Sequence, residues 1–151
     1  MSIIREQIVT EALTWEHTPF AHFQCCKGAG VDCAHLIIGV GKAVGILPED
    51  FTVPYYDKYW HVFKLNDLLV STMRQHHFVE KNPVNMLPGD ILTFKINLNT
   101  CHTAILLDSN TIIHARSGRL TRKVVRHTLN HSWRHNYLTH CFAYPMVGDR
   151  S

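Results

Sequence analysis

The stretch Lys27–Val44, KGAGVDCAHLIIGVGKAV, constrains the fold of this 151-residue chain more than any other segment. Two glycines precede Asp32 and Cys33, and a largely apolar run follows. Asp is a favoured helix N-cap because its carboxylate accepts a hydrogen bond from a free N–H of the first turn. We therefore predict a buried helix over residues 32–45, with Cys33 at its first position and a glycine at its end.

The place of Cys33 at the start of this helix has a chemical consequence. The helix dipole and the free N–H groups favour an anion there, so we expect the pKa of the thiol to fall. A cysteine nucleophile requires such a thiol. The stretch by itself fits a small buried cysteine at the start of an ordinary core helix equally well.

A cysteine nucleophile needs a base, and the base needs an orienting group. His102 begins the apolar segment CHTAILL, and His114 ends the segment TIIHA twelve residues later. A turn at residues 108–110 would pair the two segments as a hairpin and bring both histidines to the same end, where cross-strand Cβ atoms are ~4.5–5.5 Å apart. This geometry allows Cys33 as nucleophile, His102 as base and His114 as orienting residue. For the hairpin considered alone, the alternative is that both histidines simply hydrogen-bond to water at the ends of their strands.

The apolar spacing changes from helical in the first half of the chain to a period of two in the second half. We predict helices at 2–14, 32–45 and 64–76, an aromatic loop at 47–60, and strands at 78–81, 90–96, 102–107, 111–115, 123–127 and 138–144. This order is typical of an α+β fold with N-terminal helices packed on a central antiparallel sheet. The length favours a single domain over residues 1–151. The segments Phe51–Trp60 and Cys25–Gly30 are candidate walls of a cleft.

Composition limits the class of protein further. The formal charge is +3 and the pI is about 8.6, which suits an anionic partner without requiring one. The odd set of five cysteines is expected to be reduced. The first residues, MSIIREQIVTEAL, contain no apolar core of signal-peptide length, and no segment approaches a membrane span. We therefore expect synthesis in the cytoplasm without a signal peptide and no membrane partner.

Four segments, GAGVDCAHLI, LPGDILTF, CHTAILLDSNTIIHA and FAYP, resemble in this order the NlpC family of bacterial cell-wall cysteine peptidases, which have a papain-like fold. The likeness runs from about Trp15 to Pro145. The sequence most resembles the subgroup encoded in phages and gene transfer agents. Members of this subgroup carry a similar TPY…KGxGxDC opening, a PGDI strand and an H…IIHA hairpin.

The resemblance implies a role for each matching residue. Cys33 matches the nucleophile, His102 the general base, His114 the third polar residue, and Asp32 the acidic residue before the nucleophile. The implied reaction is hydrolysis of amide bonds in peptidoglycan stem peptides, often between D-glutamate and a diamino acid, with no cofactor and no metal. Together with the missing signal peptide, the resemblance implies a protein that is associated with a virion or particle, with phage-tail or particle proteins as partners, or is released by lysis.

The sequence also departs from the family. The family usually has Tyr at the position of Phe20, where the hydroxyl helps to polarise the oxyanion. The oxyanion hole must then rely on the Cys33 N–H, with His22 as a substitute donor. One such donor is worth about 10²–10³ in turnover, so a slow enzyme is expected. His35 replaces a Gly on the first helical turn, where it could narrow the cleft or shift the Cys33 pKa.

Three other functions compete with this interpretation. The first is a zinc site. The candidate ligands are Cys25, Cys26, Cys33, His35, Cys101 and His102. No two of them have the CxxC or HxxxH spacing of a structural zinc site, which argues against this function. The Phe20 and His35 departures would suit a non-catalytic wall-binding or tail-structural module. The basic stretch Arg116–Arg134 could bind nucleic acid, but we favour a solvated face and expect no nucleic-acid partner.

We expect Cys141 in the core and Trp133 against the end of the sheet.

Overall fold

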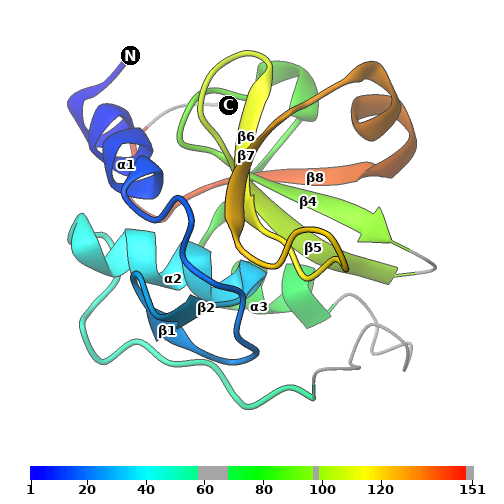
Figure 1. The fold of residues 1–151 in the computed structure, drawn as a ribbon. Helices are drawn as coiled ribbons and strands as arrows, with labels where there is room; N and C mark the ends of the chain where they lie inside the picture. The colour runs from blue at the N-terminus through cyan, green and yellow to red at the C-terminus, as the bar shows by residue number, and fades with distance from the viewer. Residues whose placement is uncertain (58–67, 97–98, 149–151) are drawn as a thin grey trace.

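The computed structural model describes residues 1–57, 68–96 and 99–148, and this part contains three α-helices (Figure 1). They are α1 (Ile3–Leu13), α2 (Cys33–Ala43) and α3 (Leu68–Gln75). Ser2 caps α1 by accepting a hydrogen bond from the Arg5 N–H at 3.4 Å. The first two predicted helices are confirmed to within two residues. Residues 64–67 of the third, and residues 58–60 of the predicted aromatic loop, lie outside the described residues.

The second half of the chain forms one six-stranded sheet in the order β3-β8-β4-β5-β6-β7, with every neighbouring pair antiparallel. Its strands are β3 (Val79–Lys81), β4 (Ile91–Ile96), β5 (Asn99–Leu106), β6 (Thr111–Ala115), β7 (Val124–Thr128) and β8 (Leu138–Ala143). The predicted α+β fold is confirmed. The last strand inserts between β3 and β4, which no local sequence pattern indicates.

The structure differs from the sequence prediction at several short segments. The predicted loop before α2 contains a small hairpin of β1 (Cys25–Cys26) and β2 (Gly30–Val31). Strands of two residues are too short to produce a periodic signal. Strand β5 begins at Asn99 rather than at His102, so residues 99–101 belong to the strand and not to a loop. A 3₁₀ turn, η1 (Pro83–Asn85), and a π-helical turn, η2 (Trp133–Tyr137), complete the fold.

Helix α2 is the centre of the larger core. Its residues Leu36 and Val40 are fully buried, which explains why this helix is apolar on nearly every side. Gly39 allows close contact with the segment after α1, because a Cβ atom there would lie 2.5 Å from the Trp15 ring. The Tyr144 hydroxyl donates a hydrogen bond to the Ile37 carbonyl at 2.6 Å and ties the helix to the end of the chain. Helix α2 is therefore fixed on both sides.

The two faces of the sheet pack differently. Ile105 and Ile113 belong to the larger core, which contains α2. Ala104, Leu106 and Ile112 alternate with them and belong to a second, smaller core. Trp133 of η2 packs against this smaller core, which also contains the fully buried Cys141, so both sequence expectations are confirmed. Burial raises the pKa of the Cys141 thiol to about 12, which makes it inert.

A buried ion cluster fixes the start of β4. Asp90, in the Pro-Gly-Asp segment, pairs with Arg5 at 2.9 Å and Lys81 at 2.8 Å, and accepts the Leu87 N–H at 2.8 Å. All three charged side chains are buried. The cluster joins α1, β3 and β4, so this acidic residue has a structural role. No helix in the described ranges is long and apolar enough to cross a membrane.

Candidate active site

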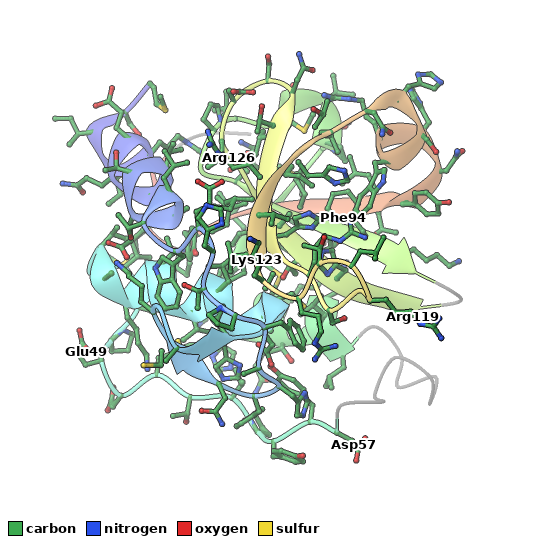
Figure 2. The ribbon with its side chains drawn as sticks, in the orientation of Figure 1. Glu49, Asp57, Phe94, Arg119, Lys123 and Arg126 are labelled. Atoms are coloured by element: carbon green, nitrogen blue, oxygen red, sulfur yellow. The ribbon has the colours of Figure 1, made fainter. Side chains whose placement is uncertain are left out.

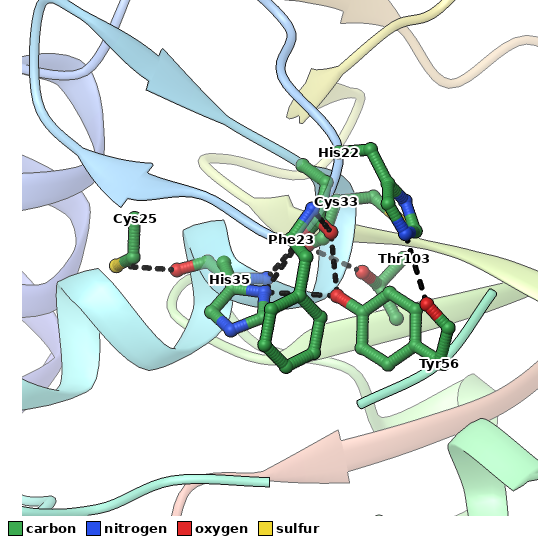
Figure 3. A network of polar contacts seen from close by, with 8 residues as sticks. His22, Phe23, Cys25, Cys33, His35, Tyr56 and Thr103 are labelled. Carbon is green, nitrogen blue, oxygen red and sulfur yellow. Dashed lines mark hydrogen bonds and ion pairs between the residues drawn. The ribbon is translucent and has the colours of Figure 1, made fainter. Parts of the chain in front are cut away.

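Cys33 is the first residue of α2 and is partly exposed, as the sequence predicts. Its carbonyl accepts a hydrogen bond from the Thr103 hydroxyl at 2.9 Å (Figure 3). Thr103 is buried and directly follows His102 on β5. The start of the helix therefore lies against the strand that carries the predicted base, across 70 residues of sequence.

Asp32 caps this helix and does more than the sequence predicts. Oδ1 accepts the His35 N–H at 2.8 Å, which is the expected cap. Oδ2 accepts the Phe23 N–H at 2.8 Å and the Tyr56 hydroxyl at 2.5 Å. Burial acts to raise the pKa of Asp32, but the hydrogen bonds from His35 and Tyr56 outweigh it and hold this pKa below its usual value. The carboxylate is thus ionised and joins three segments of the chain.

His35 is a buried part of the same network (Figure 3). Its Nδ1 lies 3.0 Å from Asp32 Oδ1 and 2.8 Å from the Tyr56 hydroxyl, and its ring contacts Phe23 edge-on at 4.7 Å. The imidazole that replaces the family's Gly therefore binds the loop before α3 to the first turn of α2. The role of Tyr56 was missed because no spacing pattern links residues 32 and 56.

His102 and His114 are brought together as predicted. His102 Nε2 and His114 Nδ1 are 2.7 Å apart, which is hydrogen-bond distance. In the strand register Ile105 pairs with Ile113, so the two histidines are diagonal rather than directly opposite neighbours. His114 is fully buried and His102 is partly buried.

Both imidazoles are held neutral. Burial lowers the pKa of His102 to about 4, and the positive charge of Arg116 adds to the shift. Burial lowers the pKa of His114 to about 2, with further contributions from His102, Arg116 and His127. At neutral pH the pair therefore carries one N–H on each ring, which suits a base and its orienting partner.

The structure gives the surroundings of Phe20 and His22, the two side chains considered at the oxyanion. Phe20 pairs with Val31 through a parallel bridge, and its ring lies 5.7 Å from the Arg122 guanidinium. His22 Nε2 lies 2.9 Å from the Tyr56 carbonyl, which can only accept, so Nε2 donates. The Nε2–H is therefore engaged by the Tyr56 carbonyl and is not free for an oxyanion.

A cavity of about 640 Å³ lies beside the first turns of α2. Residues that line it include Ala34 and Thr103, next to the predicted nucleophile and base, and Phe51, Pro54, Tyr55 and Tyr56. Residues 51–56 of the predicted wall Phe51–Trp60 therefore line a cavity. Residues 58–60 of this wall lie outside the described residues. Residues 25–30 do not appear among the described lining residues of the cavity.

The zinc alternative gains no support from the described residues, among which no three metal-ligand side chains form a group. Cys25 and Cys26 are free and exposed in β1. Cys25 Sγ donates to the His35 carbonyl at 3.3 Å, and burial raises the pKa of this thiol. The Cys101 side chain lies outside the described part of the chain.

Comparison with solved structures shows the same fold. NlpC2 from Trichomonas vaginalis matches 93% of this chain at 16% identity with a TM-score of 0.68, and NlpC1 from the same organism matches 93% at 14% identity with 0.63. The chain spans only 46% and 44% of those two proteins. The NlpC/p60 domain of the peptidoglycan hydrolase SagA matches 92% of this chain, with 97% of its own length covered, at 16% identity and a TM-score of 0.62.

Comparison with curated protein sequences gives no significant match. The model of the NlpC/P60 family matches residues 18–141, which include Asp32, Cys33, His102 and His114. Because this match covers most of the chain and the fold agrees, the protein belongs to the NlpC/P60 family.

Proposed function

We propose that this protein is a cysteine peptidase that hydrolyses amide bonds in peptidoglycan stem peptides. One observation carries the proposal. His102 is hydrogen-bonded to His114, and the residue after His102 on the same strand, Thr103, is hydrogen-bonded to the Cys33 carbonyl. Family membership supports the same reaction class. The SagA domain, which has the same fold, comes from a peptidoglycan hydrolase and adds further support.

The residues have complementary roles in this reaction. Cys33 attacks the amide carbonyl, and His102 accepts the thiol proton and later gives it to the leaving amine. His114 accepts the His102 Nε2–H, which leaves His102 Nδ1 for the thiol. The Cys33 N–H, at the start of α2, stabilises the oxyanion. Water then hydrolyses the acyl-enzyme and releases the acid product.

The bond between D-glutamate and a diamino acid is the substrate bond that we propose. Purified peptidoglycan and isolated stem peptides should be digested with the wild type, Cys33→Ala and Cys26→Ala, and the products read by mass spectrometry. Cys26 is the matched control because it is an exposed free thiol outside the proposed mechanism. New free amino groups with the wild type and Cys26→Ala, but not with Cys33→Ala, are expected. Cleavage by all three would overturn the assignment of Cys33.

The pairing of Cys33 with His102 can be tested without substrate. The rate of alkylation of Cys33 against pH reports the pKa of its thiol. We expect His102→Ala to raise this pKa, because it removes the group that accepts the thiol proton. An unchanged alkylation profile would show that the two side chains are not coupled.

The position of Phe20 favours a second candidate function, a wall-binding module with little or no turnover. Its ring carries no hydroxyl and packs near Arg122. Retention of the wild type on pelleted peptidoglycan, with no cleavage, would support this function.

We also propose that the protein reaches the wall in a phage-type particle, for which the sequence resemblance is the support. Its detection by mass spectrometry in purified particles is the test.

A further inference from the structure

A third histidine continues the proposed catalytic pair across the sheet. His102, His114 and His127 lie on the neighbouring strands β5, β6 and β7. His127 pairs with Ile112, two residues before His114, so its side chain is on the same face as His114. The His114 and His127 rings are nearly parallel, at 16°, with centroids 5.5 Å apart. The hydrogen-bonded His102–His114 pair has centroids 5.0 Å apart.

Two nitrogens of this row are buried and have no hydrogen-bond partner among the described residues. They are His114 Nε2 and His127 Nδ1. His114 is fully buried, whereas His127 is partly exposed. Buried polar atoms in proteins are nearly always hydrogen-bonded, so each of these two nitrogens requires a partner. In this structure the two nitrogens are not hydrogen-bonded to each other, and the two rings are stacked.

The tautomer of His114 makes the two nitrogens complementary. His102 donates its Nε2–H to His114 Nδ1 when its own Nδ1 is left for the thiol, so a neutral His114 must carry its proton on Nε2. A neutral His127 with its proton on Nε2 presents an acceptor at Nδ1. The donor of one ring is thus matched by the acceptor of the next.

The surroundings keep all three rings neutral. Trp133 lies nearly perpendicular to His114 and His127, at 82° and 83°, with centroids 5.8 and 5.5 Å away, and contacts His102 at 6.5 Å. Burial lowers the pKa of each histidine, and Arg116 adds its positive charge at all three. A neutral row has one proton for each ring, which is what a directed chain of hydrogen bonds requires.

We propose that the His127 ring, which is partly exposed, rotates to accept the His114 Nε2–H at Nδ1. His127 would then be a positioning residue for the proposed catalytic pair, fixing the His114 tautomer that orients His102. The positioning role rests on the proposed peptidase function. The hydrogen bond itself does not, because it can be observed in the protein without substrate.

The first test is ¹⁵N NMR of the protein labelled at histidine, which separates protonated from unprotonated ring nitrogens. In the wild type we expect His114 to be protonated at Nε2, with a proton that exchanges slowly with water. His127→Phe keeps a ring but no acceptor, and this proton should then exchange at least tenfold faster. His127→Asn restores an acceptor near the position of Nδ1 and should restore slow exchange. Protonation of His114 at Nδ1 in the wild type would overturn the proposal without any variant.

The second test is the pH dependence of peptide cleavage by the same proteins. We expect His127→Phe to lower kcat about tenfold with KM unchanged and to move the acidic limb of the profile, and His127→Asn to recover most of kcat. His131→Ala removes an exposed histidine that contacts His135 outside the row, and should leave the profile unchanged.

The two proposals fail in different ways. Cleavage that depends on Cys33, with a profile unchanged in His127→Phe, would refute the positioning role and leave the peptidase intact. Absence of cleavage by the wild type would refute the peptidase, while the NMR spectrum would still decide the hydrogen bond. Thermal unfolding of each variant shows whether it is folded under the conditions of the assay.

Discussion

At the scale of single residues, the site contains two polar networks. One is the histidine row on the sheet. The other joins Asp32, His35 and Tyr56 around the first turn of α2. The second network explains why His35 is tolerated on a helix turn beside the proposed nucleophile, because its ring is turned toward Asp32 and Tyr56.

Tyr56→Phe tests the second network. The change removes the hydroxyl that donates to the Asp32 carboxylate at 2.5 Å. Because the acceptor is charged, we expect a loss of about 1.5–3 kcal/mol in the free energy of unfolding, measured by chemical denaturation. The pKa of Asp32 should rise toward its usual value.

Tyr55→Phe is the matched control, since Tyr55 is 70% exposed. Its effect should be within about 0.5 kcal/mol, as for most surface substitutions. Equal losses for the two variants would show that the Tyr56 hydroxyl contributes nothing specific.

At the scale of elements, the site depends on how α2 is seated on the sheet. Gly39 brings α2 close to Trp15 of the segment after α1, and Tyr144 bonds the Ile37 carbonyl. Thr103 then bonds the first residue of the helix to β5. These contacts decide where the start of α2 meets the strand that carries His102, and so decide the geometry of the proposed site. The side chains of Arg119, Lys123 and Arg126 are exposed. Figure 2 labels them on β7 and on the loop before it.

Thr103→Val tests this seating. The variant keeps the shape of the side chain but leaves the Cys33 carbonyl without its hydroxyl donor. We expect a loss of about 1–3 kcal/mol in stability. Because small displacements of reacting groups are costly, kcat should fall on the order of tenfold with KM little changed.

Thr93→Val is the control for the loss of a buried hydroxyl. Thr93 is fully buried, and its hydroxyl lies 2.8 Å from that of Thr139, on the pairing of β4 with β8. It should lose stability without a comparable loss of kcat. A fall of kcat of the same size in both variants would contradict the special role of Thr103.

At the scale of the whole molecule, folding buries two histidines in their neutral form, which low pH disfavours. His102 and His114 have pKa values lowered to about 4 and about 2, from an ordinary value near 6.5. Below pH 6.5 the unfolded chain protonates both rings, while the folded protein does so only at much lower pH. The unfolded state therefore binds more protons, and stability falls as the pH falls.

The expected result is a decline in the free energy of unfolding between pH 6 and pH 4.5. Each of the two histidines contributes up to about 1.4 kcal/mol per pH unit. Urea denaturation at several pH values measures the slope, and His114→Asn should reduce it by about one such contribution. A slope unchanged in His114→Asn would show that His114 is not buried in its neutral form.

Much of this protein can be predicted from the sequence, because local rules govern the features concerned. The Asp32 cap and the apolar run predict α2, and the period of two predicts most of the sheet. The spacing of His102 and His114 on a short hairpin predicts their contact, since a tight turn leaves few possible registers. The family follows from the same short segments.

Only the tertiary structure decided the rest, because the contacts join segments that no local rule connects. The Asp32–Tyr56 bond spans 24 residues and the Thr103–Cys33 bond spans 70. The insertion of β8 between β3 and β4 and the place of His127 beside His114 depend on the order of the strands. A sequence pattern records the preferences of neighbours along the chain, whereas these contacts arise when burial of the apolar faces brings distant segments together.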